Sequence, residues 1–391
     1  MGERETMSEF EFATAGRILF GSGTLSRVPP YAQTRGTRYL LVTGKSGTRA
    51  GRLLALLEDR NLSVCVFAVE SEPTLQTVEA GLKAAKGCRA AGVIGMGGGS
   101  VLDTAKAVAA LMTNPGDIFR YLEVVGEAEP LENPPVSCIA IPTTAGTGSE
   151  VTRNAVIGIP EKRVKVSLRS PMMLPDLAVV DPDLTLTLPP EVTAASGMDA
   201  LTQLLEAYVS SRANPMTDGF CREGLVHAAG GLLPAYRDGS RQESRKQMAL
   251  ASLMGGLALA NAGLGAVHGL AGPMGGLIGA SHGPICARLL PFVMEANVSV
   301  LKDRCPESRV LERYQEVAQI LTGSISAAIE DGIRWLHDLC AEMKIPRLSD
   351  LGLKETLLPE LAANAAKASS MKANPVALAE PELMRILEAA L

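Results

Sequence analysis

Carboxylate and imidazole groups with the spacing of metal ligands come from two segments of the chain. Asp199, Gln203 and Glu206 are spaced i, i+4 and i+7 on one predicted helix and therefore share a face. His268 and His282 follow in an apolar segment, and the chain has only 4 histidines. One carboxylate with two imidazoles suits a divalent first-row metal, and open coordination positions suit Fe²⁺ or Zn²⁺. The alternative is that each histidine is a hydrogen-bonded residue of the core.

A turn of three glycines and a serine, Gly97–Ser100, has the composition of a phosphate-binding site. It follows an apolar strand and opens a predicted helix, Val101–Met112. Glycine amides at a helix N-terminus attract anions, and the missing Cβ atoms let a phosphate approach the backbone. The turn lacks the third glycine of the GxGxxG fingerprint. The alternative is a tight turn in which Ser100 is the N-cap and Asp103 completes a capping box.

A second loop, Ile141–Thr152, also follows a predicted strand. Thr143, Thr144, Thr147 and Ser149 provide hydroxyl groups around two glycines. Such a loop suits a nicotinamide or a ribose, but threonine-rich loops are also common as simple turns.

The elements that must position these groups differ between the two halves of the chain. Up to about residue 188, apolar strand-like runs alternate with helical stretches, which predicts a parallel α/β sheet with crossover helices. The predicted strands are Arg38–Thr43, Ser63–Val69, Ala91–Met96, Val136–Ile141 and Leu177–Val180. The predicted helices between them include Arg52–Asp59, Thr77–Ala90 and Val101–Met112.

After residue 188 the pattern becomes helical, which predicts an all-α second domain over residues 189–391 and an α/β first domain over residues 1–188. The predicted helices are Glu191–Ser211, Met216–Tyr236, Glu243–Asn261, Pro306–Leu321, Ser324–Met343 and Glu355–Lys367.

Composition excludes several classes of protein. The 391 residues predict about two domains at about 100–200 residues each. With 37 basic and 42 acidic residues and no basic run, a nucleic-acid partner or an anionic membrane surface is not expected. The 7 cysteines are scattered without a CxxC pair, which predicts no disulfide framework and fits a reducing, cytoplasmic location. The N-terminus carries acidic residues and lacks the apolar core of a signal peptide.

One stretch, Gln247–Ala287, contains no charged residue and is long enough for a membrane span. It is also dense in glycine and contains Pro273, Asn261 and two histidines. Because glycine and proline break an isolated helix, we interpret the stretch as closely packed helices inside a globular domain.

Four ordered motifs resemble the iron-containing (group III) alcohol dehydrogenase family: GGGSVLDTAKAVA, IPTTAGTGSEVT, SGMDALTQLLEAY and NAGLGAVHGLAGPMGGLIGASHG. The likeness runs from Phe20–Gly23 to Asn374–Leu378. It implies a dehydroquinate synthase-like fold, in which an N-terminal dinucleotide-binding domain is followed by a helical metal-binding domain, with the active site between them.

The resemblance also implies roles for particular residues. Gly97, Gly98, Gly99 and Ser100 would hold the pyrophosphate of NAD or NADP. The residues expected around the nicotinamide and ribose are Asp103, Thr143, Thr144, Thr147 and Lys165. Asp199, His268 and His282 match metal ligands of the family.

Two positions depart from the family pattern. Gln203 stands where the family usually has a fourth ligand, histidine, and its amide oxygen is a weaker donor to one divalent Fe²⁺ or Zn²⁺ ion. Gly272 replaces a histidine beside the nicotinamide, which predicts a wider substrate pocket and a proton path through water or a ribose hydroxyl.

The choice of dinucleotide depends on Gly44, which ends the run Leu40–Thr43 where NAD-preferring relatives often carry aspartate. Without that carboxylate a 2′-phosphate is not repelled, and Lys45 or Arg49 would attract it. The alternative is a simple turn glycine, and NAD or NADP remain open at this point.

The sequence therefore predicts metal-dependent hydride transfer between a small alcohol or aldehyde and NAD(P), in a homodimer or larger homo-oligomer. No side chain is an obvious general base, and Asp103 is the residue considered for a catalytic role. Alternatives are a metal-independent reductase of the maleylacetate type, a sugar-phosphate cyclase, and a non-catalytic dinucleotide-binding protein.

Overall fold

The computed structural model describes residues 9–45 and 47–391. Its first part is built on a six-stranded sheet of order β1-β8-β5-β4-β2-β3, in which every neighbouring pair is parallel. The strands are β1 (Ile18–Phe20), β2 (Arg38–Gly44), β3 (Ser63–Val69), β4 (Gly92–Gly97), β5 (Ser137–Pro142) and β8 (Leu177–Val180). All five predicted strands are confirmed, each within one residue of its expected ends.

Helices cover both faces of this sheet, because alternate residues of the strands point in opposite directions. Tyr39 and Leu41 of β2 join a core on the face of α1 and α2. Leu40 and Val42 of the same strand join a core on the face of α3 and α4. The helices are α1 (Val28–Gln33), α2 (Gly51–Glu58), α3 (Leu75–Gly87) and α4 (Gly99–Thr113). The predicted parallel sheet with crossover helices is confirmed.

A separate antiparallel hairpin, β6 (Asn154–Ile159) and β7 (Val164–Arg169), follows the threonine-rich loop. The sequence analysis did not predict this hairpin. The hairpin packs against α4 with Ala155, Ile157 and Leu168 buried, so it shares a core with the third and fourth helices instead of extending the sheet.

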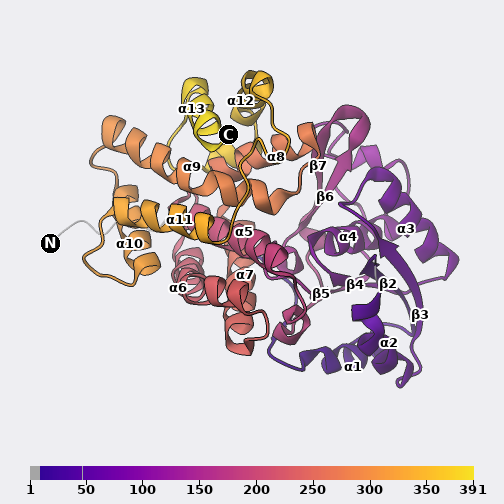
Figure 1. Cartoon of the computed structure of the whole chain (residues 1–391). Coiled ribbons are helices and arrows are strands. Elements are labelled where there is room, and N and C mark those ends of the chain that lie inside the picture. The colour runs from indigo at the N-terminus through magenta and orange to yellow at the C-terminus, as the bar shows by residue number, and fades with distance from the viewer. Residues whose placement is uncertain (1–8, 46) are drawn as a thin grey trace.

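The second part of the chain is helical, as predicted (Figure 1). Its helices are α5 (Pro190–Val209), α6 (Pro215–Arg237), α7 (Gln242–Ala262), α8 (Ala266–Ile278), α9 (His282–Arg304), α10 (Arg309–Thr322), α11 (Ile329–Glu342), α12 (Leu358–Ala366) and α13 (Glu380–Ala390). One expected helix, Ser324–Met343, begins five residues late at Ile329, because Ser324–Ala327 form a turn.

Helix α5 is the centre of this helical part. Its residues from Gly197 to Val209 are all buried, and it packs against α6, α7 and α9. A helix that is buried on all sides fixes its polar side chains firmly, so the residues of its inner turns are well placed to build a site.

The charge-free stretch forms α7, α8 and the start of α9, which pack within the helical core as predicted. Among the described residues, α9 is long and apolar enough to cross a membrane, and 67% of its apolar window is buried inside the protein. Helices α7 and α8 pass the same test only as a pair bent by 96°. Core helices of soluble proteins often pass this test, so it is weak evidence for a membrane.

The two parts of the chain meet where the threonine-rich loop crosses α7 (Figure 1). A Cβ atom on Gly148 would lie 2.3 Å from the Cα of Gly256, so both backbones need glycine at this crossing. Val151, Leu253 and Leu257 form a small apolar core beside it. The sheet side and the helical side are thereby held in direct contact, while the domain boundary at residue 188 stays a prediction.

Candidate active site

A pocket of about 610 Å³ opens at the carboxyl ends of β2, β4 and β5. The chain runs from β2 outward to β3 and then back to β4 on the other side of β2, so the pocket lies where the strand order reverses. Ligands of open α/β sheets bind at such switch points. The pocket is lined by Thr43, Gly44, Lys45, Gly47, Arg49, Ala50, Met96, Gly97, Gly98, Thr143 and Thr144.

The glycine turn brings a helix N-terminus to this pocket. Helix α4 begins at Gly99 with Gly98 as its N-cap, and no side chain in the described part of the chain caps it. The alternative in which Ser100 is the N-cap of a capping box with Asp103 is therefore wrong. A Cβ atom on Gly99 would lie 2.8 Å from Thr147, so close packing excludes a larger residue there. The uncapped N-terminus suits an anion.

The threonine-rich loop is fixed to the glycine turn and to α4. The backbone N–H of Thr143 donates to the carbonyl of Gly97 at 2.9 Å. The Ser149 hydroxyl donates to Asp103 Oδ1 at 2.6 Å, and the N–H of Val156 donates to Asp103 Oδ2 at 2.9 Å. Both oxygens of the Asp103 carboxylate therefore hold the loop and the hairpin in place, and its roles as a catalytic group or cofactor ligand stay predictions.

A buried lysine that the sequence reading missed strengthens the same junction. Lys106 is 1% exposed, and its Nζ donates to the carbonyl of Ser149 and the hydroxyl of Thr152, each at 2.9 Å. It also lies 3.3 Å from Asp103 Oδ1. A buried ammonium with this many acceptors is stable, and it locks the loop onto α4.

Lys165 lies at the junction between the hairpin and the helical part, outside the pocket lining. It forms an ion pair with Glu72, which follows β3. A Cβ atom on Gly275 would lie 2.8 Å from its Nζ, so the lysine packs directly over α8. Its expected contact with the nicotinamide or ribose stays a prediction.

The predicted metal ligands converge in the helical part. Asp199 of α5, His268 of α8 and His282 of α9 offer ligand atoms that lie within 4.8 Å of one another, together with the Sγ of Cys286. Asp199 Oδ1 is 3.4 Å from His268 Nε2 and 3.7 Å from His282 Nε2. The Asp199 and His268 side chains are buried, whereas that of His282 is 37% exposed, so the cluster is open on the His282 side.

Gln203 lies one helical turn after Asp199 and supports that residue. Its Nε2 donates to Asp199 Oδ2 at 3.1 Å. Its Oε1 lies beside Gly255 of α7, and it has no hydrogen-bond partner among the described residues. The expected weak ligation of a metal by this oxygen stays a prediction.

Glu206, the third residue of the i, i+4, i+7 series, contacts the ring nitrogen of His268 that does not face Asp199. Its Oε2 is 2.6 Å from His268 Nδ1, and its Oε1 accepts the N–H of Val267 at 2.6 Å. A carboxylate on one ring nitrogen directs the other toward a metal and raises the basicity of the imidazole. The same carboxylate satisfies the N-terminus of α8, which fixes the helix that carries His268.

Mutual attraction sets the protonation of the cluster. Burial alone would raise the pKa of Asp199 and lower that of His268. His268 and His282 instead lower the pKa of Asp199, and Cys286, Asp199 and Glu206 raise that of His268. Burial would also raise the pKa of the Cys286 thiol, and the neighbouring His282 and His268 lower it below its ordinary value. The same contacts favour protonated imidazoles, and because a metal binds the neutral ring, binding of a divalent cation here would release protons.

Gly272 faces open space on α8. No atom of the described residues lies within 4 Å of a Cβ built at this position. The wider substrate pocket that the sequence predicts at this position stays a prediction.

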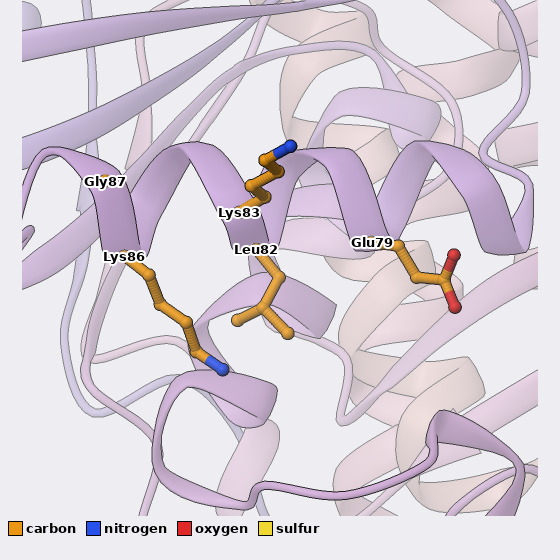
Figure 2. Close-up of a pocket in the computed structure, with 5 residues that line it drawn as sticks. All are labelled: Glu79, Leu82, Lys83, Lys86 and Gly87. Carbon is orange, nitrogen blue, oxygen red and sulfur yellow. The ribbon is translucent and has the colours of Figure 1, made fainter.

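A second hollow, of about 550 Å³, lies on α3 and contains none of the predicted site residues (Figure 2). It is lined by Glu79, Leu82, Lys83, Lys86 and Gly87 of that one helix. Lys83 and Lys86 point to opposite sides in Figure 2, so they do not converge on a ligand.

Comparisons with known proteins agree with this geometry. The family model for iron-containing alcohol dehydrogenase matches residues 15–182, and that for the C-terminal part of the Fe-containing alcohol dehydrogenase family matches residues 193–391. Alcohol dehydrogenase 4 of Saccharomyces cerevisiae is 37% identical over 377 residues, which cover 95% of this chain and 96% of the yeast protein.

Solved structures give the same result. The crystal structure of a 1,3-propanediol oxidoreductase superposes with a TM-score of 0.91 at 34% identity and covers 98% of this chain and 100% of that one. A sulfoacetaldehyde reductase from Bifidobacterium kashiwanohense, in complex with NAD⁺, has a TM-score of 0.86 at 27% identity over 98% and 99% of the two chains. The family resemblance seen in the motifs is confirmed, and the chain belongs to the iron-containing alcohol dehydrogenase family.

Proposed function

We propose that the protein transfers hydride reversibly between a small alcohol and NAD(P), with one divalent metal held by Asp199, His268 and His282. Membership of the family makes it an oxidoreductase of the alcohol dehydrogenase type. The observation that carries the finer proposal is the convergence of one carboxylate oxygen and two Nε2 atoms within 3.4–3.7 Å.

The donor set fits a metal ion. Asp199 Oδ1 is buried without a hydrogen-bond partner among the described residues, although two imidazoles lie close to it. An ion between these atoms would satisfy the oxygen, which otherwise stays buried without a partner. A bound Fe²⁺ or Zn²⁺ supplies a Lewis acid that polarises the oxygen of the alcohol or aldehyde.

The residues of the α/β part would orient the dinucleotide. We assign the pyrophosphate to the glycine turn, whose uncapped helix N-terminus presents free N–H groups. Thr143 and Thr144 line the pocket, and Thr147 packs against Gly99 at its edge. Lys165 is assigned to the end of the dinucleotide nearest the helical part, because it packs over α8.

The absence of a side chain at Gly272 supports a broad substrate range. We propose that the open space on α8 admits alcohols with bulky groups, and that a water or a ribose hydroxyl carries the proton. A Gly272→His variant should lose kcat/KM for the bulkiest aldehydes of a panel by about tenfold, with small aldehydes nearly unaffected. Gly272→Ala is the matched control, since it adds only a methyl group. Equal rates for all aldehydes in Gly272→His would contradict the proposal.

The choice of cofactor is proposed to include NADP(H). Gly44 lines the pocket, and Lys45 and Arg49 lie on the same wall. A 2′-phosphate would meet two cations there and no carboxylate.

Other features of the function rest on the sequence. We propose a cytoplasmic homodimer or larger homo-oligomer that acts on small alcohols or aldehydes, without a nucleic-acid or membrane partner. The slight excess of acidic residues and the scattered cysteines support this environment.

Metal content and turnover measured on one sample would test the central proposal. The protein would be purified without chelator, analysed by elemental mass spectrometry, and assayed for NADH and NADPH oxidation with an aldehyde panel. We expect close to one zinc or iron per chain and turnover that a chelator abolishes. Turnover in metal-free protein would favour the metal-independent reductase. Dinucleotide binding without turnover would favour a non-catalytic binding protein.

A further inference from the structure

Cys286 belongs to the metal cluster by position, although its spacing in the sequence indicated no such role. It lies one helical turn after His282 on α9, so the two side chains share a face. Its Sγ is 3.3 Å from His282 Nε2, and its side chain is buried. It is one of the four residues whose ligand atoms all lie within 4.8 Å of one another.

The separations within the cluster are those of atoms that share one ion. On a tetrahedral zinc with bonds of about 2.0–2.3 Å, neighbouring ligand atoms lie about 3.3–3.8 Å apart. Three pairs in the cluster measure 3.3, 3.4 and 3.7 Å. A simple thiol–imidazole hydrogen bond would explain the first distance only, and would leave Asp199 Oδ1 without a partner.

The remaining polar side chains next to Asp199 point their ligand atoms elsewhere, since the unpartnered Oε1 of Gln203 lies beside Gly255 of α7. Gln203 directs its amide nitrogen toward Asp199, and Glu206 binds the far nitrogen of His268. Without Cys286, the cluster would offer three donors and one negative charge. With Cys286 it offers four donors, the number that a tetrahedral structural zinc site uses.

We propose that Cys286 is the fourth protein ligand of the metal, and that the site binds zinc in preference to iron. The donor set of one carboxylate, two imidazoles and one thiolate is softer than one of oxygen and nitrogen alone, and thiolates favour zinc over hard or octahedral ions. The inference rests on the proposed function only in assuming that a divalent metal is bound.

The test is the spectrum of the full-length protein loaded with Co²⁺, together with its affinity for Zn²⁺. A thiolate bound to cobalt gives an intense sulfur-to-metal charge-transfer band in the near ultraviolet, which oxygen and nitrogen ligands do not give. The variants are Cys286→Ser and Cys286→Ala. The matched control is Cys221→Ala, because Cys221 is an equally buried cysteine on α6 outside the cluster.

The expected result is a charge-transfer band in wild type and Cys221→Ala that both Cys286 variants lack. Zinc affinity from chelator competition should fall by at least about 100-fold in Cys286→Ala, since loss of a second-shell partner alone costs about 10–100-fold. X-ray absorption on zinc-loaded wild type should show one sulfur at about 2.3 Å, and it needs no variant to fold.

Two results would overturn the inference. One is wild-type protein that binds cobalt or zinc in a 1:1 ratio without a sulfur neighbour, which leaves the proposed metal-dependent function standing. The other is wild-type protein that binds neither metal, which would contradict both this inference and the proposed metal-dependent function. Zinc affinity of Cys286→Ala within about threefold of wild type would also contradict a ligand role.

Discussion

The proposed nucleotide pocket and the candidate metal cluster are built in opposite ways. The pocket is formed mainly by backbone, at the ends of adjacent parallel strands and at the N-terminus of α4. The metal cluster is formed by side chains of three helices, and its members range from Asp199 to Cys286. One site therefore follows from local chain geometry, and the other depends on how distant helices pack.

This difference determines how each site responds to substitution. In the pocket, an added side chain can block the approach of a phosphate to the backbone. Removal of a side chain usually leaves the backbone amides in place. In the cluster, each side chain that is removed takes a ligand or a supporting carboxylate with it. The following predictions begin with the substitution of largest expected effect.

Replacement of one cluster imidazole should have the largest effect. His268→Ala should lose bound metal and reduce kcat/KM by about 10³-fold or more, because a Lewis acid contributes several kcal/mol to the barrier. Elemental analysis and aldehyde reduction measure both. His227→Ala is the control, since His227 pairs with Glu223 on α6 outside the cluster. If metal-free His268→Ala protein kept wild-type turnover, the metal would not be needed for catalysis, and the expected difference between the two sites would be absent.

Glu150 is a buried carboxyl group of the threonine-rich loop, and its ionisation should make the stability of the protein depend on pH. Burial raises the pKa of Glu150 from 4.5 to about 7. Between these values the folded protein holds a proton that the unfolded chain releases, so stability falls as pH rises from about 4.5 to 7. The loss amounts to about 3 kcal/mol at 1.36 kcal/mol per pKa unit.

Glu150→Gln should remove that loss, because glutamine stays neutral. Denaturant unfolding from pH 4.5 to 8 would measure it, with the exposed Glu307→Gln as control. Parallel stability curves for wild type and Glu150→Gln would show that Glu150 is ionised in the folded protein.

The supporting carboxylate of the cluster should matter less than a ligand. Glu206→Gln keeps an acceptor for the N–H of Val267 but loses the charge beside His268. Metal affinity should fall about 10–100-fold. Glu223→Gln removes the carboxylate from His227, a histidine outside the cluster, and should leave affinity unchanged. An equal loss in both variants would point to a general effect of charge and not to the support of His268.

The pocket should respond most to an added group. In Gly44→Asp the new side chain has room, since no atom of the described residues lies within 4 Å of its Cβ. Its carboxylate would repel a 2′-phosphate and accept from a ribose 2′-hydroxyl. We expect kcat/KM with NADPH to fall at least about tenfold relative to NADH. Gly44→Asn has the same shape without the charge. Equal losses with both cofactors would reject the role of charge at this position.

Most of the fold could be predicted because its signals are local. Five of the six strands of the main sheet are continuous apolar runs, and the turn at Gly97–Ser100 follows one of them directly, whereas the three-residue strand Ile18–Phe20 was not predicted. The hairpin Asn154–Arg169 was missed, although Val164–Arg169 alternates between apolar and polar residues and Asn154–Ile159 is mostly apolar, and both patterns are strand signals. The capping box at Ser100 was wrong because helix α4 begins earlier, with Gly98 as its N-cap.

The sequence by itself determined the fold class and the family, and it predicted three members of the candidate metal cluster. These depend on periodicity and on motifs a few residues long, which stay the same in any context. Tertiary structure alone decided that Cys286 joins the cluster, that Glu206 holds His268, and that Lys106 locks the threonine-rich loop. Each of these three contacts joins residues of different helices or loops, and their distance in space is set by helix packing, which the order of residues along the chain does not reveal.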